Sequence, residues 1–273
     1  MKTSTICTLM GIAALATPAF AAPTLFATSG SYIYRIDLGN LDNGGLPQGV
    51  DAFQLDTALV SLTIGNDGEL WGTERHDSSG DGNYAIYRID DLLATPVMTQ
   101  QGDFINSLSS SIVNINGTIT AFLDDTSEMV ALDMDTDTYN VVGSFANLPV
   151  SPASSGYDAV TDTSYGIRDT ELFQFDAAGT ELSSTKIADL DFGGLTGPIG
   201  GEIVDGVYYH AIMQNLTMHI FAIDLITGST EELVAFEVHE GGSLGLAGIP
   251  TVPTPGSAAL LAMGSLMTMR RRR

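Results

Sequence analysis

A five-residue pattern recurs five times along the chain and constrains the fold more than any other feature. Each copy reads apolar, apolar or aromatic, any residue, apolar, Asp. The copies are "IYRID" (33–37), "IYRID" (86–90), "MVALD" (129–133), "LFQFD" (172–176) and "IFAID" (220–224). They start 53, 43, 43 and 48 residues apart. A period of about 40–50 residues is typical of propeller blades or related arrays.

The surroundings of each copy predict a unit of four antiparallel strands, which we name a, b, c and d in chain order. The pattern itself is strand c. A strand with a small or aromatic centre precedes it, such as "ELWGTER" before the second copy. Ahead of four copies lies a further strand and a turn, such as Asn116-Gly117 or Asp205-Gly206. These dipeptides favour tight hairpins. A turn and strand d follow the Asp, and no helical periodicity competes in residues 22–250.

The two ends of the repeat predict a closed ring. The first unit begins with strand b at Leu25 and has no strand a, whereas "SLGLAGI" (243–249) is an apolar strand left over after the last unit. If 243–249 supplies strand a of the first unit, the ring closes and exposed sheet edges disappear. The sequence therefore predicts an all-β, five-bladed propeller of four-stranded antiparallel blades over residues 22–250.

The charge of this central region excludes several partners. It contains all 33 acidic residues of the chain and only 5 of the 10 basic ones, a formal charge of −28. Such a surface repels nucleic acid and anionic lipid, whereas it attracts cations and stays soluble. We therefore expect no nucleic-acid partner.

Residues 1–21 predict a secretory signal peptide. Lys2 supplies the positive start, Leu9–Leu15 the apolar core, and Ala19-Phe20-Ala21 the small-x-small cleavage pattern. The single cysteine, Cys7, lies inside this segment, so the mature chain has no disulfide. A secreted domain without disulfides depends on its core and on any bound ion.

Residues 251–273 form a separate tail. After the Pro- and Gly-containing spacer comes an apolar run of 13 residues, 257–269, which we predict to be helical. A stable membrane span needs about 20 residues. Four arginines follow, which the positive-inside rule keeps in the cytoplasm while the preceding domain is exported. We expect a marginal transmembrane helix that anchors the chain transiently in the inner membrane.

The order of spacer, apolar helix and arginine cluster resembles a PEP-CTERM sorting signal. The residues that carry the resemblance are Val252, Pro253, Pro255, Arg270, Arg271, Arg272 and Arg273. Thr254 and Gly256 depart from the usual Pro-Glu-Pro. The resemblance covers about 22 residues. It implies processing by an exosortase-type membrane protease, followed by secretion or attachment to the cell surface.

The longest predicted b–c loop, 73–84, is the candidate for a cofactor site. Asp77, Asp81 and Asn83 offer side-chain oxygens spaced by small residues, which suits calcium. The loop lacks the EF-hand pattern, because Arg88 stands where the bidentate glutamate belongs. The alternative is a solvated loop without metal. In "DMDTDT" (133–138) the alternating Asp residues favour a hairpin turn over a metal site.

Catalytic signals are weak. The chain has no Gly-x-Ser-x-Gly elbow and no His-Glu-x-x-His motif. A glycosidase needs two carboxylates at a set distance. Glu74, Glu202 and Asp169 are the candidates for this pair. The sequence leaves open whether the protein is an enzyme and favours a protein without catalytic activity.

Four residues are candidates for ligand binding. His76 lies in the long b–c loop, and Tyr208, Tyr209 and His210 place three bulky, polar-tipped side chains in one b-strand. A carbohydrate-stacking platform is one interpretation of that triplet, and packing inside the core is the other.

Taken together, these features predict an exported, surface-sorted bacterial envelope or matrix protein with a non-catalytic binding or scaffold propeller. An extracellular glycan or an envelope protein would be its partner. One alternative is a glycan-active enzyme or lectin that uses the acidic loop face. A second is a calcium-stabilised structural module.

Overall fold

The computed structural model describes residues 22–40, 50–65, 68–75, 84–92, 95–104, 108–123, 128–145, 154–178, 181–197 and 199–249. The predicted signal peptide and the predicted sorting tail, with their helices, lie outside these residues. Among the described residues, no helix is long and apolar enough to cross a membrane. In the described part of the chain, one segment is helical, a 3-10 turn at Leu38–Asn40.

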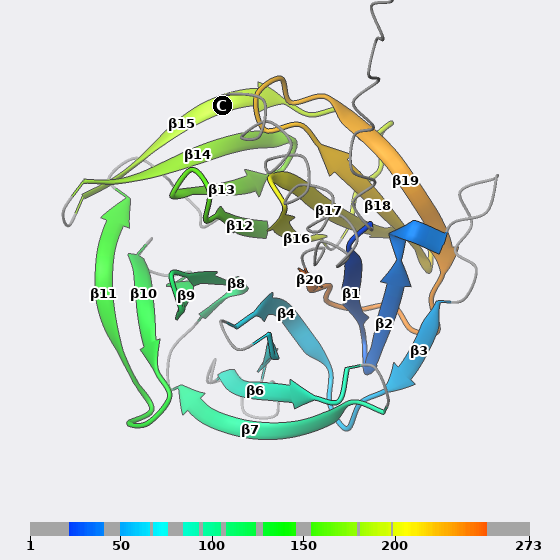
Figure 1. Cartoon of the computed structure of the whole chain (residues 1–273), viewed down its shortest axis with the longest axis horizontal. Coiled ribbons are helices and arrows are strands. Elements are labelled where there is room, and N and C mark those ends of the chain that lie inside the picture. The colour runs from blue at the N-terminus through cyan, green and yellow to red at the C-terminus, as the bar shows by residue number, and fades with distance from the viewer. Residues whose placement is uncertain are drawn as a thin grey trace, which may run out of the picture. The chain divides into compact units, whose positions relative to one another are not determined.

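The described strands form five four-stranded antiparallel blades around a common axis (Figure 1), as the sequence predicts. From the inner to the outer strand, the first three blades are β20 (Leu246–Ile249), β1 (Thr24–Ser29), β2 (Tyr32–Asp37) and β3 (Asp51–Gln54); β4 (Leu59–Ile64), β5 (Leu70–Arg75), β6 (Tyr84–Asp90) and β7 (Val97–Phe104); β8 (Leu108–Ile115), β9 (Thr118–Leu123), β10 (Glu128–Asp133) and β11 (Thr138–Phe145). The last two are β12 (Ser154–Asp158), β13 (Thr163–Arg168), β14 (Glu171–Ala178) and β15 (Glu181–Asp189); β16 (Ile199–Val204), β17 (Val207–Gln214), β18 (Thr217–Ile223) and β19 (Thr230–Glu237).

The C-terminal strand closes the ring as expected. Strand β20 pairs antiparallel with β1, with Leu25 opposite Gly248 and Ala27 opposite Leu246. Each inner strand also contacts the inner strands of the two neighbouring blades, so the circle of contacts is complete. This pairing confirms that the strand left over after the last unit supplies strand a of the first blade.

The repeated Asp has a local structural role at the end of strand c. The carboxylates of Asp37, Asp133 and Asp224 each accept a hydrogen bond from the backbone N–H two residues on, at 2.9, 3.0 and 2.9 Å. An Asp that bonds the backbone in this way starts a tight turn. The Asp therefore ends strand c and sets the c–d hairpin, which explains why it recurs with the pattern.

A β-bulge also recurs with the pattern. In blades 2 to 5 the c–d pairing shifts between the first and second residues of each copy, for instance between Ile86 and Tyr87 and between Ile220 and Phe221. A bulge at one fixed place increases the local twist of the strand. The four blades therefore share a bulge that increases the twist between strands c and d.

The a–b turns adopt the conformation that their residues favour. Asn116 and Gly117 have φ of 49° and 91°, and Asp205 and Gly206 have φ of 52° and 77°. Positive φ at both central positions matches the twist of the flanking strands. The predicted hairpins at these two places are confirmed.

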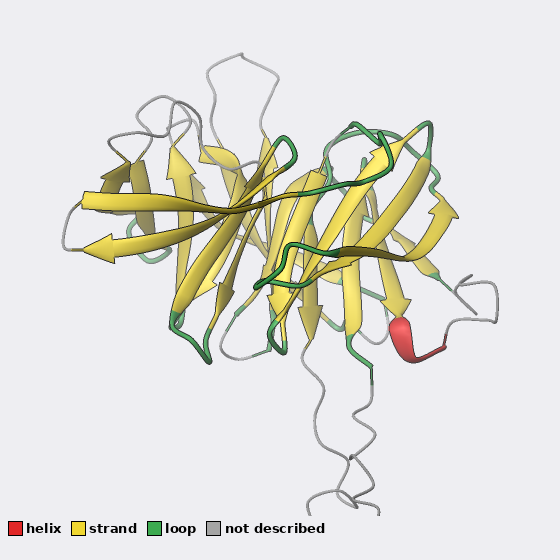
Figure 2. Cartoon of the chain, turned by 90° about the horizontal axis from the view of Figure 1, so that it is seen from above, coloured by secondary structure: helices red, strands yellow, loops and turns green. Residues whose placement is uncertain are grey.

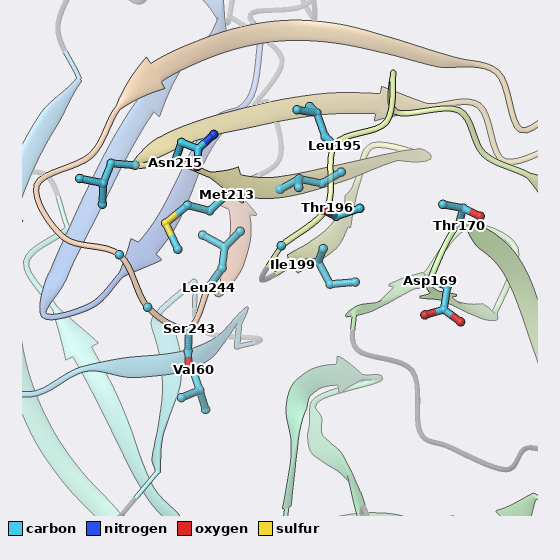
Figure 3. Close-up of a pocket in the computed structure, with 15 residues that line it drawn as sticks. Val60, Asp169, Thr170, Leu195, Thr196, Ile199, Met213, Asn215, Ser243 and Leu244 are labelled. Atoms are coloured by element: carbon cyan, nitrogen blue, oxygen red, sulfur yellow. The ribbon is translucent and has the colours of Figure 1, made fainter.

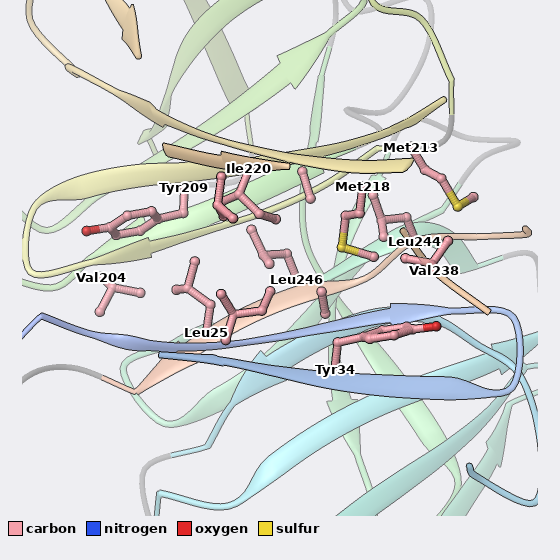
Figure 4. Close-up of a cluster of buried hydrophobic side chains, with 14 residues drawn as sticks. Leu25, Tyr34, Val204, Tyr209, Met213, Met218, Ile220, Val238, Leu244 and Leu246 are labelled. Atoms are coloured by element: carbon pink, nitrogen blue, oxygen red, sulfur yellow. The ribbon is translucent and has the colours of Figure 1, made fainter. Parts of the chain in front are cut away.

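The hydrophobic core lies between blades. Figure 4 shows one cluster, in which Leu25 and Tyr34 of blade 1 face Val204, Tyr209 and Ile220 of blade 5. All five side chains are buried. The ring is therefore held by apolar faces of successive sheets and not by a single central core.

One pairing departs from the prediction of five separate sheets. The end of β11 pairs in parallel with the start of β15, with Ser144 opposite Glu181 and Phe145 opposite Leu182. Blades 3 and 4 thus form one eight-stranded sheet. The pairing satisfies backbone groups that would otherwise lie unpaired at an outer edge.

Candidate ligand-binding site

The blades define two faces of the ring, seen from the side in Figure 2. The b–c and d–a loops emerge on one, which we call the loop face, and the a–b and c–d turns lie on the other, the turn face. A cavity of about 950 Å³ opens on the loop face. Pockets for small molecules measure roughly 300–1,000 Å³. We call it the ligand cavity; its lining is Val60, Asp169, Thr170, Leu195, Thr196, Gly197, Ile199, Ile212, Met213, Asn215, Leu216, Gly241, Gly242, Ser243 and Leu244.

The ligand cavity has an apolar floor and a polar rim. Val60, Ile212 and Leu244 are buried at its base, whereas Asp169 and Ser243 are exposed at its edge. Figure 3 shows Val60 and Leu244 on one side of the space and Asp169 on the other. Asp169 is the one acidic residue in the lining, and no basic residue lines it among those that the structure describes. The cavity therefore suits a ligand with an apolar body that is neutral or positively charged.

Leu216 is a site residue that the sequence analysis did not single out. It has a φ of 61°, follows Asn215 at 53°, and keeps its side chain 49% exposed at the cavity. An apolar L-residue in the left-handed region costs about 1–2 kcal/mol. Two a–b turns place Gly after a positive-φ Asn or Asp, at Asn116-Gly117 and Asp205-Gly206, whereas this b–c turn places Leu after Asn215. Strained, exposed side chains concentrate at binding sites, which makes Leu216 a candidate ligand contact.

The last d–a loop is fastened to the first blade and fixes one wall of the ligand cavity. The carboxylate of Glu240 accepts hydrogen bonds from the Ser31 backbone N–H at 3.0 Å and from its hydroxyl at 2.9 Å. These two bonds, backbone first, lower the pKa of Glu240. The ring of His239 stacks on Tyr32 with centroids 4.7 Å apart. These contacts of Glu240 and His239 with the first blade hold residues 241–244 in place at the cavity.

The axis of the ring is closed below the ligand cavity. Ser61, Ser111 and Ser154 face the axis with Gly200 and Gly245, and the space they leave does not admit a water molecule. A Cβ on Gly245 would lie 2.8 Å from the backbone of Ser61. Small residues therefore let the inner strands approach closely, and the cavities at the two faces are separate.

The three candidate carboxylates lie in three different environments. Asp169 is exposed in the b–c turn of blade 4 and lines the ligand cavity. Glu74 is half-buried in β5, where its carboxylate accepts hydrogen bonds from the hydroxyls of Thr57 and of Tyr87, the latter at 2.6 Å. Glu202 lies on β16 at a separate cavity on the turn face. The structure does not bring the three around one cleft.

Glu202 is a deeply buried carboxyl group whose pKa is shifted. Its side chain is 6% exposed, and burial raises its pKa to about 8. The backbone N–H of Ile203 and the Thr63 hydroxyl, each 2.9 Å away, oppose that shift. Strongly shifted carboxyl groups are concentrated at functional sites.

The aromatic triplet packs between blades. Tyr208 and His210 point toward blade 4, where the Tyr208 hydroxyl bonds Ser154 at 2.6 Å and the His210 ring stacks on Phe192 at 4.9 Å. Tyr209 packs in the cluster between blades 1 and 5 (Figure 4). All three are buried, which agrees with the core interpretation of the triplet. Burial lowers the pKa of His210 to about 3, and its Nε2 has no partner among the described residues.

Residues 76–83 of the predicted calcium loop lie outside the described residues; they include His76, Asp77, Asp81 and Asn83. In the part of the chain that is described, no group of three His, Cys, Asp or Glu side chains gathers in a way that could hold a metal ion. The segment 133–138 forms the c–d hairpin of blade 3, with Asp137 at a φ of 53°. The turn interpretation of "DMDTDT" is therefore confirmed.

Fold and cavity together define a five-bladed β-propeller with an opening on its loop face. No protein-family model matches the chain, and no curated protein matches it either. Among solved structures, a chain of a nidogen/laminin complex is 15% identical, with 83% of this chain and 98% of that chain covered and a TM-score of 0.52. A Bacteroides caccae protein of unknown function is 13% identical, with 84% and 99% covered and a TM-score of 0.49. Identities this low show the fold alone.

Proposed function

We propose that the propeller is a non-catalytic binding module that takes a small neutral or cationic ligand with an apolar body in the ligand cavity. The lining of the ligand cavity supports this proposal most directly. Its floor is apolar, formed by Val60, Ile212 and Leu244, and its rim has one carboxylate, Asp169. Buried apolar area supplies affinity in such sites, and a few polar groups fix orientation. The carboxylate disfavours anions.

Binding without catalysis is the better supported of the candidate activities. Glycoside hydrolysis needs two carboxyl groups flanking one sugar, about 5–10 Å apart. Asp169 and Glu202 line cavities at opposite faces, and Glu74 is engaged by Thr57 and Tyr87. Nor do aromatic side chains line the ligand cavity among the described residues, so a sugar-stacking platform has no support there.

We further propose that the protein acts outside the cytoplasm, at the cell surface or in the extracellular matrix. The support is the sequence of the two ends: a signal-like start at 1–21 and a tail at 251–273 that resembles a sorting signal. An exosortase-type protease would process the tail. The −28 charge of residues 22–250 suits a protein that stays soluble after export.

A thermal-shift screen on the full chain tests the binding proposal. The panel contains neutral, cationic and anionic peptides matched in their apolar side chains, and neutral oligosaccharides as the alternative ligand class. Ser243 is exposed at the rim, so Ser243→Trp fills the opening of the cavity. Ile226→Trp adds the same side chain at an exposed c–d turn on the turn face and serves as the control.

We expect at least one neutral or cationic ligand to stabilise the wild type by about 2.7 kcal/mol at a hundredfold excess over Kd. The stabilisation should vanish in Ser243→Trp and persist in Ile226→Trp. Preference for the anionic members, equal stabilisation of Ser243→Trp, or no stabilisation by any member would contradict the proposal.

A further inference from the structure

A second cavity, of about 210 Å³, opens on the turn face at the far end of the inner strands. We call it the Glu202 cavity. Its polar lining comes from four different blades: Thr63 on β4, Asn114 and Asn116 at β8, Tyr157 on β12 and Glu202 on β16. The remaining lining residues are Ile64, Ala159, Ile203 and Gly248.

The groups around the Glu202 carboxyl are arranged as donors. The Asn114 backbone N–H donates to the Thr63 hydroxyl oxygen at 3.1 Å, which leaves the hydroxyl proton to donate to Glu202 Oε2 at 2.9 Å. The Ile203 N–H donates to Oε1 at 2.9 Å, and the Tyr157 backbone also favours the ionised form. Donors stabilise a carboxylate, whereas a protonated carboxyl would need an acceptor for its own proton. The hydrogen bonding is therefore built for the anion.

The counter-charge that a buried carboxylate requires is not supplied by any described side chain. The ion pairs that the described Arg and Lys side chains form lie outside the Glu202 cavity; they are Arg35–Asp51, Arg88–Glu69, Arg88–Asp90, Arg168–Glu171, Lys186–Glu171 and Lys186–Asp189. Three tyrosines lie near Glu202: Tyr208, which bonds Ser154; Tyr209, which is opposite Glu202 in the β16–β17 pairing; and Tyr157, whose hydroxyl donates to the exposed Asp162 at 2.6 Å. These tyrosines are neutral and Asp162 is negative, so none of these neighbours supplies a positive charge.

We propose that the Glu202 cavity binds a small monovalent cation, either an alkali ion or a primary ammonium group, against ionised Glu202. One buried carboxylate balances one positive charge, and the hydroxyl and amide oxygens of Thr63, Asn116 and Tyr157 are neutral ligands. Calcium takes 6–8 oxygens, usually with several carboxylates, so a divalent ion would keep uncompensated charge here. The −28 charge of the central region concentrates cations at the surface.

Binding is an exchange of one cation for one proton. Where Glu202 is protonated, the entering ion displaces that proton to water, so each bound cation releases up to one proton. The apparent affinity consequently rises with pH until Glu202 is already ionised. A purely structural, protonated Glu202 releases no proton on addition of salt.

Isothermal titration calorimetry on the full chain tests the proposal. The titrants are sodium, potassium and methylammonium chloride, with tetramethylammonium chloride holding the ionic strength constant because it offers neither a bare ion nor an N–H donor. Measurements at pH 6.5 and pH 9, in two buffers of different ionisation enthalpy, count the protons released. Calcium chloride is titrated in parallel.

The variants are Glu202→Gln, Thr63→Val, and Glu74→Gln as the control, since Glu74 lies on a different blade and face. We expect saturable binding of at least one monovalent titrant, with proton release at pH 6.5 that falls at pH 9. Glu202→Gln should abolish binding. Thr63→Val should weaken it about tenfold, because a hydrogen bond to a charged group is lost. Glu74→Gln should bind as the wild type does.

Binding of sodium or potassium alone would assign an inorganic ion, and binding of methylammonium alone would assign the ammonium group of an organic ligand. The proposal is overturned if no monovalent titrant saturates, if binding releases no proton at pH 6.5, if Glu202→Gln binds equally well, or if calcium binds this site more tightly. Should Glu202→Gln fail to fold, proton release and Thr63→Val still decide the question.

Discussion

The buried carboxyl of Glu202 makes the stability of the fold depend on pH in a calculable way. Burial moves its pKa from 4.5 to about 8. Because the folded pKa is raised above the unfolded one, the protonated group stabilises the fold fully below pH 4.5, and this contribution is lost as the pH rises to 8. At 1.36 kcal/mol for each pKa unit, the full loss is about 5 kcal/mol.

Glu202→Gln isolates this effect, since glutamine keeps the shape and does not ionise. Urea unfolding in a tetramethylammonium buffer should show the wild type losing about 3 kcal/mol relative to Glu202→Gln between pH 5.5 and pH 8.5. Every other titrating group is common to both proteins and cancels in the difference. A difference in unfolding free energy that stays constant over this range would refute the reasoning about Glu202.

Three further predictions concern other parts of the molecule. Burial lowers the pKa of His210 from 6.5 to about 3, so the fold loses stability as the pH falls through this range. Between pH 6.5 and pH 5, the unfolding free energy of the wild type in urea should fall by about 2 kcal/mol more than that of His210→Asn. Unfolding free energies that fall equally in both proteins would contradict this prediction. Gly245→Ala places a Cβ 2.8 Å from the Ser61 backbone and should lower the free energy of unfolding by about 1–3 kcal/mol. Gly241→Ala is the control, because its Cβ meets only the end of the Leu216 side chain at 3.2 Å and should destabilise the fold less. Equal melting temperatures of the two variants would show that the inner strands are loosely packed at the axis. Replacing Arg270–Arg273 by alanine should reduce the amount of protein recovered at the cell surface in fractionation, and an unchanged distribution would remove the sorting proposal.

The architecture was predictable because its signals are local and repeated. The pattern that ends in Asp marks strand c in every blade, and Asp37, Asp133 and Asp224 show why the residue is retained there. Asn116-Gly117 and Asp205-Gly206 mark hairpins by their own conformational preferences. The closure by 243–249 followed from counting strands. The parallel β11–β15 pairing has no such signal, because it joins residues far apart in the chain.

The site was less predictable because its residues come together only through the ring. The ligand cavity combines Val60, Asp169, Leu195, Asn215 and Ser243, which share no spacing or motif. Of the three acids that the sequence offers as catalytic candidates, Asp169 lines this cavity and Glu202 lines another. Leu216 had a sequence signal, since Leu follows Asn in a turn where Gly is favoured, but its exposure at the cavity required the structure.

Hydrogen exchange with and without a stabilising ligand tests the central claim, that ligands bind on the loop face. The account predicts added protection of backbone amides in 195–197, 215–216 and 241–244, which line the ligand cavity. Amides at the a–b turns 116–117 and 205–206, on the turn face, should exchange as before. Protection confined to those turns, with none at 241–244, would contradict the account.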